Sequence, residues 1–313
     1  MSNQFSKIIS IGSYLPEKIL TNHDLEKLVD TSHEWIFERT GINQRHIAKE
    51  KESSVDMAYN ASLISIERSG KSPEEIDMII VATTTPERVF PSTAVLLQNK
   101  LGIEDCFAFD LNAACTGFIY ALDIADKYIR NNSVANVLVV GTEKMSALVD
   151  WNDRNTCVLF GDGAGAAMLT ASDKAGIIST TIGSNGTYKD LLTVNPESDF
   201  IEMQGNDVFK IAVNTMGKLA KDTLDSNNLS IDQIDWLIPH QANSRIINAI
   251  AKKLSLPSSK IILTVGDHGN TSAASIPLAM DYAFTNGKLK DNDTVLLEAF
   301  GAGFTWGSTL LKF

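Results

Sequence analysis

Two kinds of apolar pattern alternate along the chain. Short continuous runs, such as the Ile-Ile-Val of residues 79–81, are bounded by turn residues and are typical of buried strands. Between such runs, apolar residues recur at helical spacing, as Met57, Ala61 and Ile64 do. This alternation predicts an α/β fold in which helices cover the faces of sheets.

Local signals predict the ends of two helices. Residues 31–34, Thr-Ser-His-Glu, have the pattern of a capping box, and Gly41 suits the far end of that helix. A second helix is predicted over residues 244–254. Arg245 and Lys252 lie seven positions apart on it, about two turns, and are therefore expected on one face.

The main organising signal is an internal repeat at an offset of 158 positions, for example from Asp77 to Asp235. Three pairs of segments match at this offset: EIDMIIVA with QIDWLIPH, NAACTGFIYALDIA with NTSAASIPLAMDYA, and VLVVG with VLLEA. The alternative is that the chain contains two α/β stretches that are merely similar. We predict two duplicated halves, residues 1–172 and 173–313, that pack as five layers, α-β-α-β-α.

Composition narrows the class of protein. The chain has 313 residues, of which 44% are apolar and 21% charged, enough to bury a large core. We find no basic segment followed by an apolar one at the start and no run of 18 apolar residues, so neither a signal peptide nor a membrane span is predicted. The three cysteines are too few for a disulfide framework and lack metal-binding spacing, which favours a cytoplasmic protein with reduced thiols.

The net charge of −11 argues against general nucleic-acid binding. It would also repel an acidic protein partner unless a local basic patch opposed it.

One cysteine stands where a nucleophile could act. Cys115 follows the strand-like run 106–111 and precedes a helical pattern, which predicts a strand-to-helix elbow. The positive end of the helix favours a thiolate, the form that attacks thioesters. A buried structural cysteine is the alternative.

Two polar residues occupy corresponding places in the second half. His240 ends the strand-like segment there, and Asn270 repeats Asn112 at the 158-residue offset. The repeat thus predicts that loops from both halves meet at one sheet edge. Each residue alone could be an ordinary satisfied polar group, but together they face the elbow of Cys115.

Several longer motifs carry a family resemblance, which runs from IGSYLPEK near the start to the last residue. They are HQANSRI at 240–246, GNTSAAS at 269–275, FGDGAGAA at 160–167 and FGAGFTWGS at 300–308. With these motifs the chain resembles the β-ketoacyl-acyl carrier protein synthase III family of thiolase-like condensing enzymes. The resemblance implies the thiolase fold and a homodimer.

The resemblance also implies a reaction, a decarboxylative Claisen condensation that starts type II fatty-acid synthesis. Cys115 would take an acyl group, acetyl above all, from acyl-CoA, which is a substrate, so that no cofactor is expected. Malonyl-acyl carrier protein would then lose carbon dioxide, with His240 and Asn270 as hydrogen-bond donors to the enolate oxygen. The backbone N–H groups of Cys115 and Ala302 would form a second oxyanion hole. Ala302 departs from the glycine that is common in the family.

Binding residues follow from the same resemblance. Those matching CoA and pantetheine contacts are Trp35, Arg39, Arg154, Phe209 and Asn243. Those matching the acyl pocket are Phe90, expected to reach across the dimer, Leu159 and Phe160. The expected dock for the acyl carrier protein comprises Gln241, Ala242, Asn243, Ser244, Arg245, Lys210, Lys252 and Lys253. Ordinary solvated charges are the alternative for these basic residues.

Four other functions are rivals to this one. A Cys–His–Asn order also occurs in papain-like peptidases, but CGSCW and any place for a long repeat are missing. A thiolase would carry a second cysteine near Gly301-Ala302-Gly303, and none is present. Another condensing enzyme, making a quinolone or polyketide, is a nearer rival, and a non-catalytic scaffold a more distant one. Apart from these rivals, no metal site, no nucleic-acid partner and no membrane partner are expected.

Overall fold

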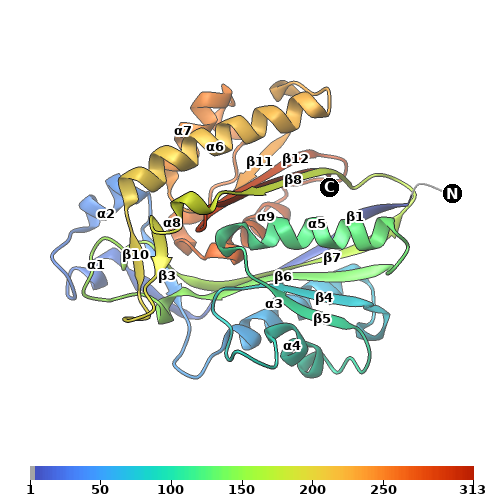
Figure 1. Cartoon of the computed structure of the whole chain (residues 1–313), viewed down its shortest axis with the longest axis horizontal. Coiled ribbons are helices and arrows are strands. Elements are labelled where there is room, and N and C mark those ends of the chain that lie inside the picture. The colour runs from blue at the N-terminus through green and yellow to red at the C-terminus, as the bar shows by residue number, and fades with distance from the viewer. Residues whose placement is uncertain (1–3) are drawn as a thin grey trace.

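The structure is a computed structural model that describes residues 4–313, and it contains two stacked sheets with helices between and outside them (Figure 1). The first sheet has the strand order β1-β7-β6-β4-β5. Its strands are β1 (Phe5–Tyr14), β4 (Met78–Ala82), β5 (Phe107–Leu111), β6 (Asn136–Lys144) and β7 (Asp162–Ser172). The parallel strands β5, β4 and β6 form one side of this sheet, and the antiparallel strands β7 and β1 complete the other.

The second sheet has the order β11-β12-β13-β8. Its strands are β8 (Ile177–Ser184), β11 (Trp236–Pro239), β12 (Thr294–Gly301) and β13 (Thr305–Lys312). Two small ladders pair β2 (Lys18–Thr21) with β3 (Gln44–Ile47), and β9 (Leu192–Val194) with β10 (Ile201–Met203).

The repeat seen in the sequence is also a repeat of strand register. Met78 on β4 pairs in parallel with Val137 on β6, and Trp236 on β11 pairs in parallel with Val295 on β12, 158 positions later in both cases. The second sheet thus repeats the first, with β8, β13, β12 and β11 in the places of β1, β7, β6 and β4. The counterpart of β5 is reduced to a single bridge between Leu237 and Ile261.

Helices form three layers around these sheets (Figure 1). The outer layer on the first sheet consists of α3 (Ser54–Ser69) and α4 (Thr93–Leu101), and that on the second consists of α6 (Gly205–Ser226) and α7 (Ser244–Leu254). Between the sheets lie α5 (Gly117–Arg130) and α9 (Ser275–Thr285). The predicted α-β-α-β-α architecture is therefore confirmed. Three short helices, α1 (Asn22–Leu25), α2 (His33–Thr40) and α8 (Val265–His268), lie at one end of the sheets.

The central layer contains the largest hydrophobic cluster, because α5 and α9 are enclosed on both sides. Phe118 and Leu122 of α5 and Ile276 of α9 are buried against strand residues such as Ile80 and Val295. Burying one side chain of this size contributes about 1.5–3 kcal/mol. This packing holds the N-terminal ends of α5 and α9 at fixed places between the halves.

The two helix-end predictions had different outcomes. Helix α7 has the predicted bounds. Helix α2 ends at Gly41, whose φ of 71° is left-handed as predicted, but its N-cap is Ser32 and not Thr31. The Ser32 hydroxyl accepts the Trp35 N–H, and Trp35 has no carboxylate to complete a capping box, so the capping box predicted at 31–34 is wrong.

The predicted division after residue 172 stays a prediction. It falls between β7, which ends at Ser172, and β8, which begins at Ile177. Over residues 4–313, no helix has the length and apolar character that crossing a membrane requires.

Candidate active site

Two matching elbows bring the halves together. The short 3-10 turns η2 (Ala114–Thr116) and η7 (Ser272–Ala274) contact each other at the N-terminal ends of α5 and α9. Ala114 and Ser272, 158 positions apart, have φ values of 47° and 48°, so both elbows share one strained backbone conformation. The duplicated elbow therefore places Cys115 of the first half beside the loop that carries Asn270.

Burial decides the ionisation state of Cys115. The pKa of its thiol is raised to about 11, chiefly by desolvation; the nearby Glu143 carboxyl raises it further, and a hydrogen bond with Ser272 opposes the shift. This shift opposes the thiolate form that the helix end was expected to favour, and that expectation stays a prediction. Loss of water around the sulfur disfavours its charged form.

Glu143 is a buried acid beside the thiol that the sequence interpretation missed. It lies on β6 and accepts the Thr84 N–H at 3.0 Å and the Thr85 hydroxyl at 2.7 Å. Burial still raises the pKa of this carboxyl. Its counterpart at the 158-residue offset is Gly301, where a Cβ would lie 2.9 Å from the Cys115 nitrogen. The repeat therefore contained a signal, since both positions flank Cys115.

His240 directly follows β11 and is 5% exposed. Its backbone N–H donates to the Glu298 carbonyl at 2.7 Å, which extends the pairing of β11 with β12 by one residue. Desolvation lowers the pKa of its imidazole to about 3, so the ring is neutral at physiological pH. A neutral imidazole donates from one nitrogen and accepts at the other.

Asn270 is held by both of its backbone groups and by its side chain. Its N–H donates to the Leu159 carbonyl at 2.8 Å, and its carbonyl accepts the Gly161 N–H at 3.0 Å. The Ser272 N–H donates to Oδ1 at 2.9 Å, so the amide NH₂ is the group left to donate to a substrate. Asn270 does not follow a strand, as its counterpart Asn112 does; it follows α8 and forms a bridge with Phe160.

The backbone around the expected oxyanion hole brings Gly301 close to Cys115. Gly301, at the end of β12, approaches the Cys115 nitrogen closely enough that a Cβ there would lie 2.9 Å away. The next residue, Ala302, has a φ outside the left-handed region, so its Cβ causes no backbone strain. The departure from glycine at Ala302 is therefore compatible with this local backbone.

A cavity of about 440 Å³ leads from the surface to Asn270. Its lining includes six of the residues predicted to bind CoA, pantetheine or the acyl group, which are Trp35, Arg39, Leu159, Phe160, Phe209 and Asn243, and also Ala242 and Arg245 of the predicted carrier-protein surface. At the mouth, the Trp35 ring has the Arg39 guanidinium 4.5 Å and the Arg154 guanidinium 5.1 Å from its centroid. Guanidinium groups beside an indole form a surface that suits a planar, negatively charged ligand.

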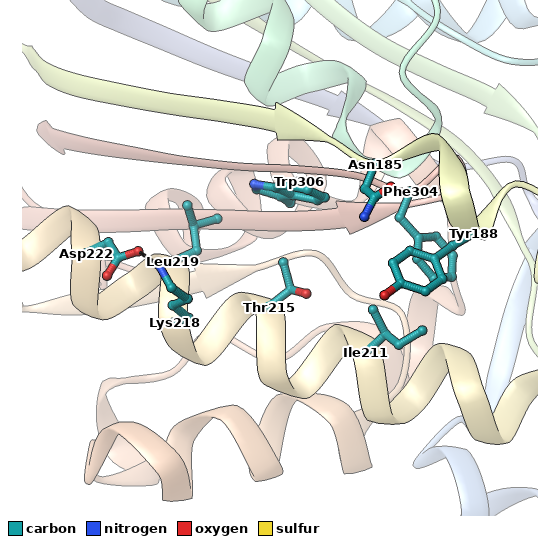
Figure 2. A pocket seen from close by; sticks show the side chains of 9 residues that line it. All are labelled: Asn185, Tyr188, Ile211, Thr215, Lys218, Leu219, Asp222, Phe304 and Trp306. Carbon is teal, nitrogen blue, oxygen red and sulfur yellow. Dashed lines mark hydrogen bonds and ion pairs between the residues drawn. The ribbon is translucent and has the colours of Figure 1, made fainter.

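A second cavity of about 360 Å³ lies between α6 and the segment after β8 (Figure 2). Its lining includes Tyr188, Ile211, Phe304 and Trp306. None of the predicted site residues lines it, so its aromatic walls belong to a separate place in the fold.

Helix α7 presents basic residues beside the mouth of the first cavity. Arg245 is exposed and its guanidinium lies 5.7 Å from the centre of the Phe209 ring, while Lys252 is also exposed. Lys253 donates to the Asn214 side chain at 3.0 Å, and Lys210 lies 3.5 Å from the Asp207 carboxylate. Ala242, Asn243 and Ser244 are half-buried at the start of this helix.

One residue was wrongly predicted to lie on the surface that binds the carrier protein. Gln241 is 1% exposed, and its amide donates to the Pro239 and Ile262 carbonyls and accepts the N–H groups of Thr264 and Val265. A side chain buried with these bonds made has no surface to offer a carrier protein. Its hydrogen bonds instead stabilise the loop after β11.

Phe90 lies outside the cavity of its own chain. It is 82% exposed and the neighbouring Val89 is 93% exposed, in the segment between β4 and α4. Large apolar side chains so exposed are typical of an interaction surface.

Comparison with known proteins agrees with this geometry. Family models described as 3-oxoacyl-[acyl-carrier-protein (ACP)] synthase III and its C-terminal part match residues 109–186 and 224–313. A β-ketoacyl-[acyl-carrier-protein] synthase III of Thioalkalivibrio sulfidiphilus (strain HL-EbGR7) is 53% identical over 320 residues, covering 99% of each chain.

Solved structures give the same result. The 3-oxoacyl-[acyl-carrier-protein] synthase III of Aquifex aeolicus VF5 superposes with a TM-score of 0.96 at 48% identity, over 98% of this chain and 100% of that one. The priming β-ketosynthase of the R1128 polyketide pathway has a TM-score of 0.95 at 35% identity, over 99% and 97% of the two chains.

The fold and the paired elbows define a thiolase-like condensing enzyme, an acyltransferase of fatty-acid biosynthesis. Within that class, the chain belongs to the β-ketoacyl-[acyl-carrier-protein] synthase III family. In the described part of the chain, no group of three His, Cys, Asp or Glu side chains is arranged to hold a metal ion.

Proposed function

We propose that the protein condenses an acyl-CoA primer, acetyl-CoA above all, with malonyl-acyl carrier protein through a thioester on Cys115. The reaction would initiate type II fatty-acid synthesis. The observation that carries the proposal is the meeting of the two elbows. The elbow that carries Cys115 contacts the second elbow, and Asn270, whose amide the second elbow orients, lines the cavity.

The first half-reaction transfers the acyl group. The Cys115 sulfur forms a bond to the thioester carbon, the bond from that carbon to the CoA sulfur breaks, and the thiol proton leaves with the CoA thiolate. Because the pKa of the Cys115 thiol is about 11, this proton transfer is part of the chemical step rather than complete beforehand. The N–H groups of Cys115 and Ala302 stabilise the tetrahedral oxyanion.

The second half-reaction makes the carbon–carbon bond. Malonyl thioester loses carbon dioxide, and the electron pair of the broken bond forms an enolate with charge on the thioester oxygen. His240 and the NH₂ of Asn270 donate to that oxygen. The enolate carbon then attacks the acyl-Cys115 carbonyl, the bond from that carbon to the Cys115 sulfur breaks, and the released thiolate takes up a proton from water to restore the thiol.

The cavity suits the pantetheine arm that both substrates share. Trp35 and Arg154 bind the adenine of CoA between them, and Arg39 binds a phosphate. Phe209 and Asn243 contact the arm, while Leu159 and Phe160 border the acyl group. The partner's Phe90 completes the acyl pocket of a homodimer.

The acidic carrier protein docks on the basic face of α7 that Arg245 and Lys252 share, with Lys210, Lys253 and residues 242–244 beside it. We further propose that the enzyme works in the cytoplasm and that the CoA thioester is a substrate, with no resident cofactor. Priming of a polyketide would use the same chemistry with another carrier protein.

The proposal is tested by measuring its half-reactions separately. His240→Ala and Asn270→Ala should each lower carbon dioxide release from malonyl-acyl carrier protein by about 10²–10³-fold, the usual effect of removing one oxyanion donor. Acylation of Cys115 by acetyl-CoA should fall much less. Equal loss of both half-reactions in either variant would contradict the division of labour.

A further inference from the structure

Ser275, the first residue of α9, makes a contact that the proposed reaction does not yet use. Its Oγ lies 2.6 Å from Nδ1 of His240 and 3.2 Å from the backbone nitrogen of Gln241. Both side chains are buried, with His240 5% and Ser275 2% exposed. A buried hydroxyl at this distance decides what the ring nitrogen can do.

The position of the Ser275 hydroxyl proton determines the direction of this hydrogen bond. The Gln241 N–H can only donate, so Ser275 Oγ accepts from it. Within residues 4–313, the hydroxyl has no other hydrogen bond than the one to His240. Since a buried donor without an acceptor is costly, the proton lies toward Nδ1, which is then the accepting nitrogen of the ring.

The duplicated fold supports a dedicated role for this pair. Subtracting 158 from 240 and 275 gives Ala82 and Gly117 in the first half. These two positions also touch, because a Cβ at Gly117 would lie 2.9 Å from the Ala82 Cβ. The fold thus places the two positions in contact in both halves, and only the half that carries His240 fills them with an imidazole and a hydroxyl.

We infer that Ser275 is a positioning residue that donates to Nδ1 of His240 and so holds the ring with its proton on Nε2, the nitrogen left to donate to the substrate. The inference rests on the proposed condensation, since that reaction needs a neutral donor at His240. Together with the Ser272 N–H, which orients the Asn270 amide, Ser275 leaves both donors preset before the malonyl group arrives.

The direct test is to determine which tautomer the His240 ring adopts. Nitrogen-15 labelling of the five histidines, with His240→Ala used to assign the ring signals, reports which nitrogen carries the proton. We expect Nε2–H at His240 from pH 6 to 8, because burial lowers the pKa of this ring to about 3. A proton on Nδ1 in the unmodified enzyme overturns the inference, whatever any variant does.

Variants add a functional readout. Ser275→Ala should give a mixture of tautomers and lower malonyl decarboxylation about tenfold, the usual scale for one hydrogen bond, with less than about twofold effect on Cys115 acylation. Ser275→Thr keeps the hydroxyl and should restore both the tautomer and the rate. Ser62→Ala is the matched control, because Ser62 is also buried, on α3, and its hydroxyl has no hydrogen-bond partner among residues 4–313.

The outcomes separate the two proposals. An unchanged tautomer and decarboxylation rate in Ser275→Ala would overturn the inference and leave the proposed condensation standing. Conversely, failure of Cys115 to accept an acyl group would overturn the condensation, while the nitrogen signals of His240 would still decide the role of Ser275.

Discussion

At the scale of single residues, burial shifts the pKa of the titratable groups around the elbow toward their neutral forms. It raises the pKa of the Cys115 thiol to about 11 and lowers that of His240 to about 3. Glu143, beside the thiol, is shifted in the direction that favours its protonated form. When these groups are neutral, negative charge develops only during the reaction. It then develops at atoms toward which hydrogen-bond donors already point.

The raised thiol pKa makes a pH-dependent prediction. Below the folded pKa the thiolate fraction grows about tenfold per pH unit, so alkylation of Cys115 by iodoacetamide should accelerate steadily from pH 7 to 10. Peptide mass spectrometry separates this site from Cys106, whose pKa is also raised to about 11. A plateau of the Cys115 rate near neutral pH would instead indicate a resting thiolate.

The sequence carries clearer signals for the proposed reacting residues than for the residues that support them. Cys115, His240 and Asn270 lie in segments that the motifs or the internal repeat single out. Both signals can be read from the sequence alone. Ser275 and Glu143 were missed because they act through contacts between segments far apart in the chain. Gln241 was misplaced because closeness to His240 in sequence does not tell whether a side chain points outward.

At the scale of elements, the duplicated strand-to-helix unit explains the site. Helical and strand periodicity predicted α7 and β4 well, because each has one clear apolar pattern. The loss of a counterpart for β5 could not be predicted, since the apolar run near Ile261 reads as a strand yet forms one bridge. Whether an apolar run pairs as a strand depends on segments elsewhere in the chain that lie beside it in the fold. The local sequence pattern does not contain that information.

Helix α7 carries the prediction that belongs to this scale. Arg245→Glu should raise KM for malonyl-acyl carrier protein about tenfold at low salt and weaken its salt dependence, because a positive group facing an acidic partner becomes negative. Acetyl-CoA loading should change much less. Lys288→Glu is the matched control, with the same change in charge at an exposed lysine beyond the end of α9.

Carrier-protein kinetics that stay the same in Arg245→Glu across a salt series would contradict this dock. A matching loss in Lys288→Glu would assign the effect to net charge rather than to α7.

At the scale of the whole molecule, one sheet edge is open to contact with a second copy of the chain. Strand β5 lies at the edge of the first sheet, and its Phe107 is 59% exposed. Unpaired strand edges with apolar side chains are readily covered by another chain. With the exposed Phe90, this edge is where we expect the homodimer to form.

Light scattering tests that expectation. The protein should have the mass of a dimer, and Phe107→Lys should shift it toward monomer with loss of condensing activity. Phe37→Lys changes another exposed phenylalanine, 47% exposed on α2, and should leave the mass unchanged. A fully active monomer at assay concentration would rule out a pocket shared between subunits.

The central claim is that Cys115 carries the acyl group, and intact-mass analysis tests it most directly. After mixing with acetyl-CoA, each chain should gain one acetyl group, on Cys115 and on neither Cys106 nor Cys157. A panel of longer and branched acyl-CoAs in the same experiment gives the primer preference. Acylation that persists at the same site count in Cys115→Ser would contradict the account.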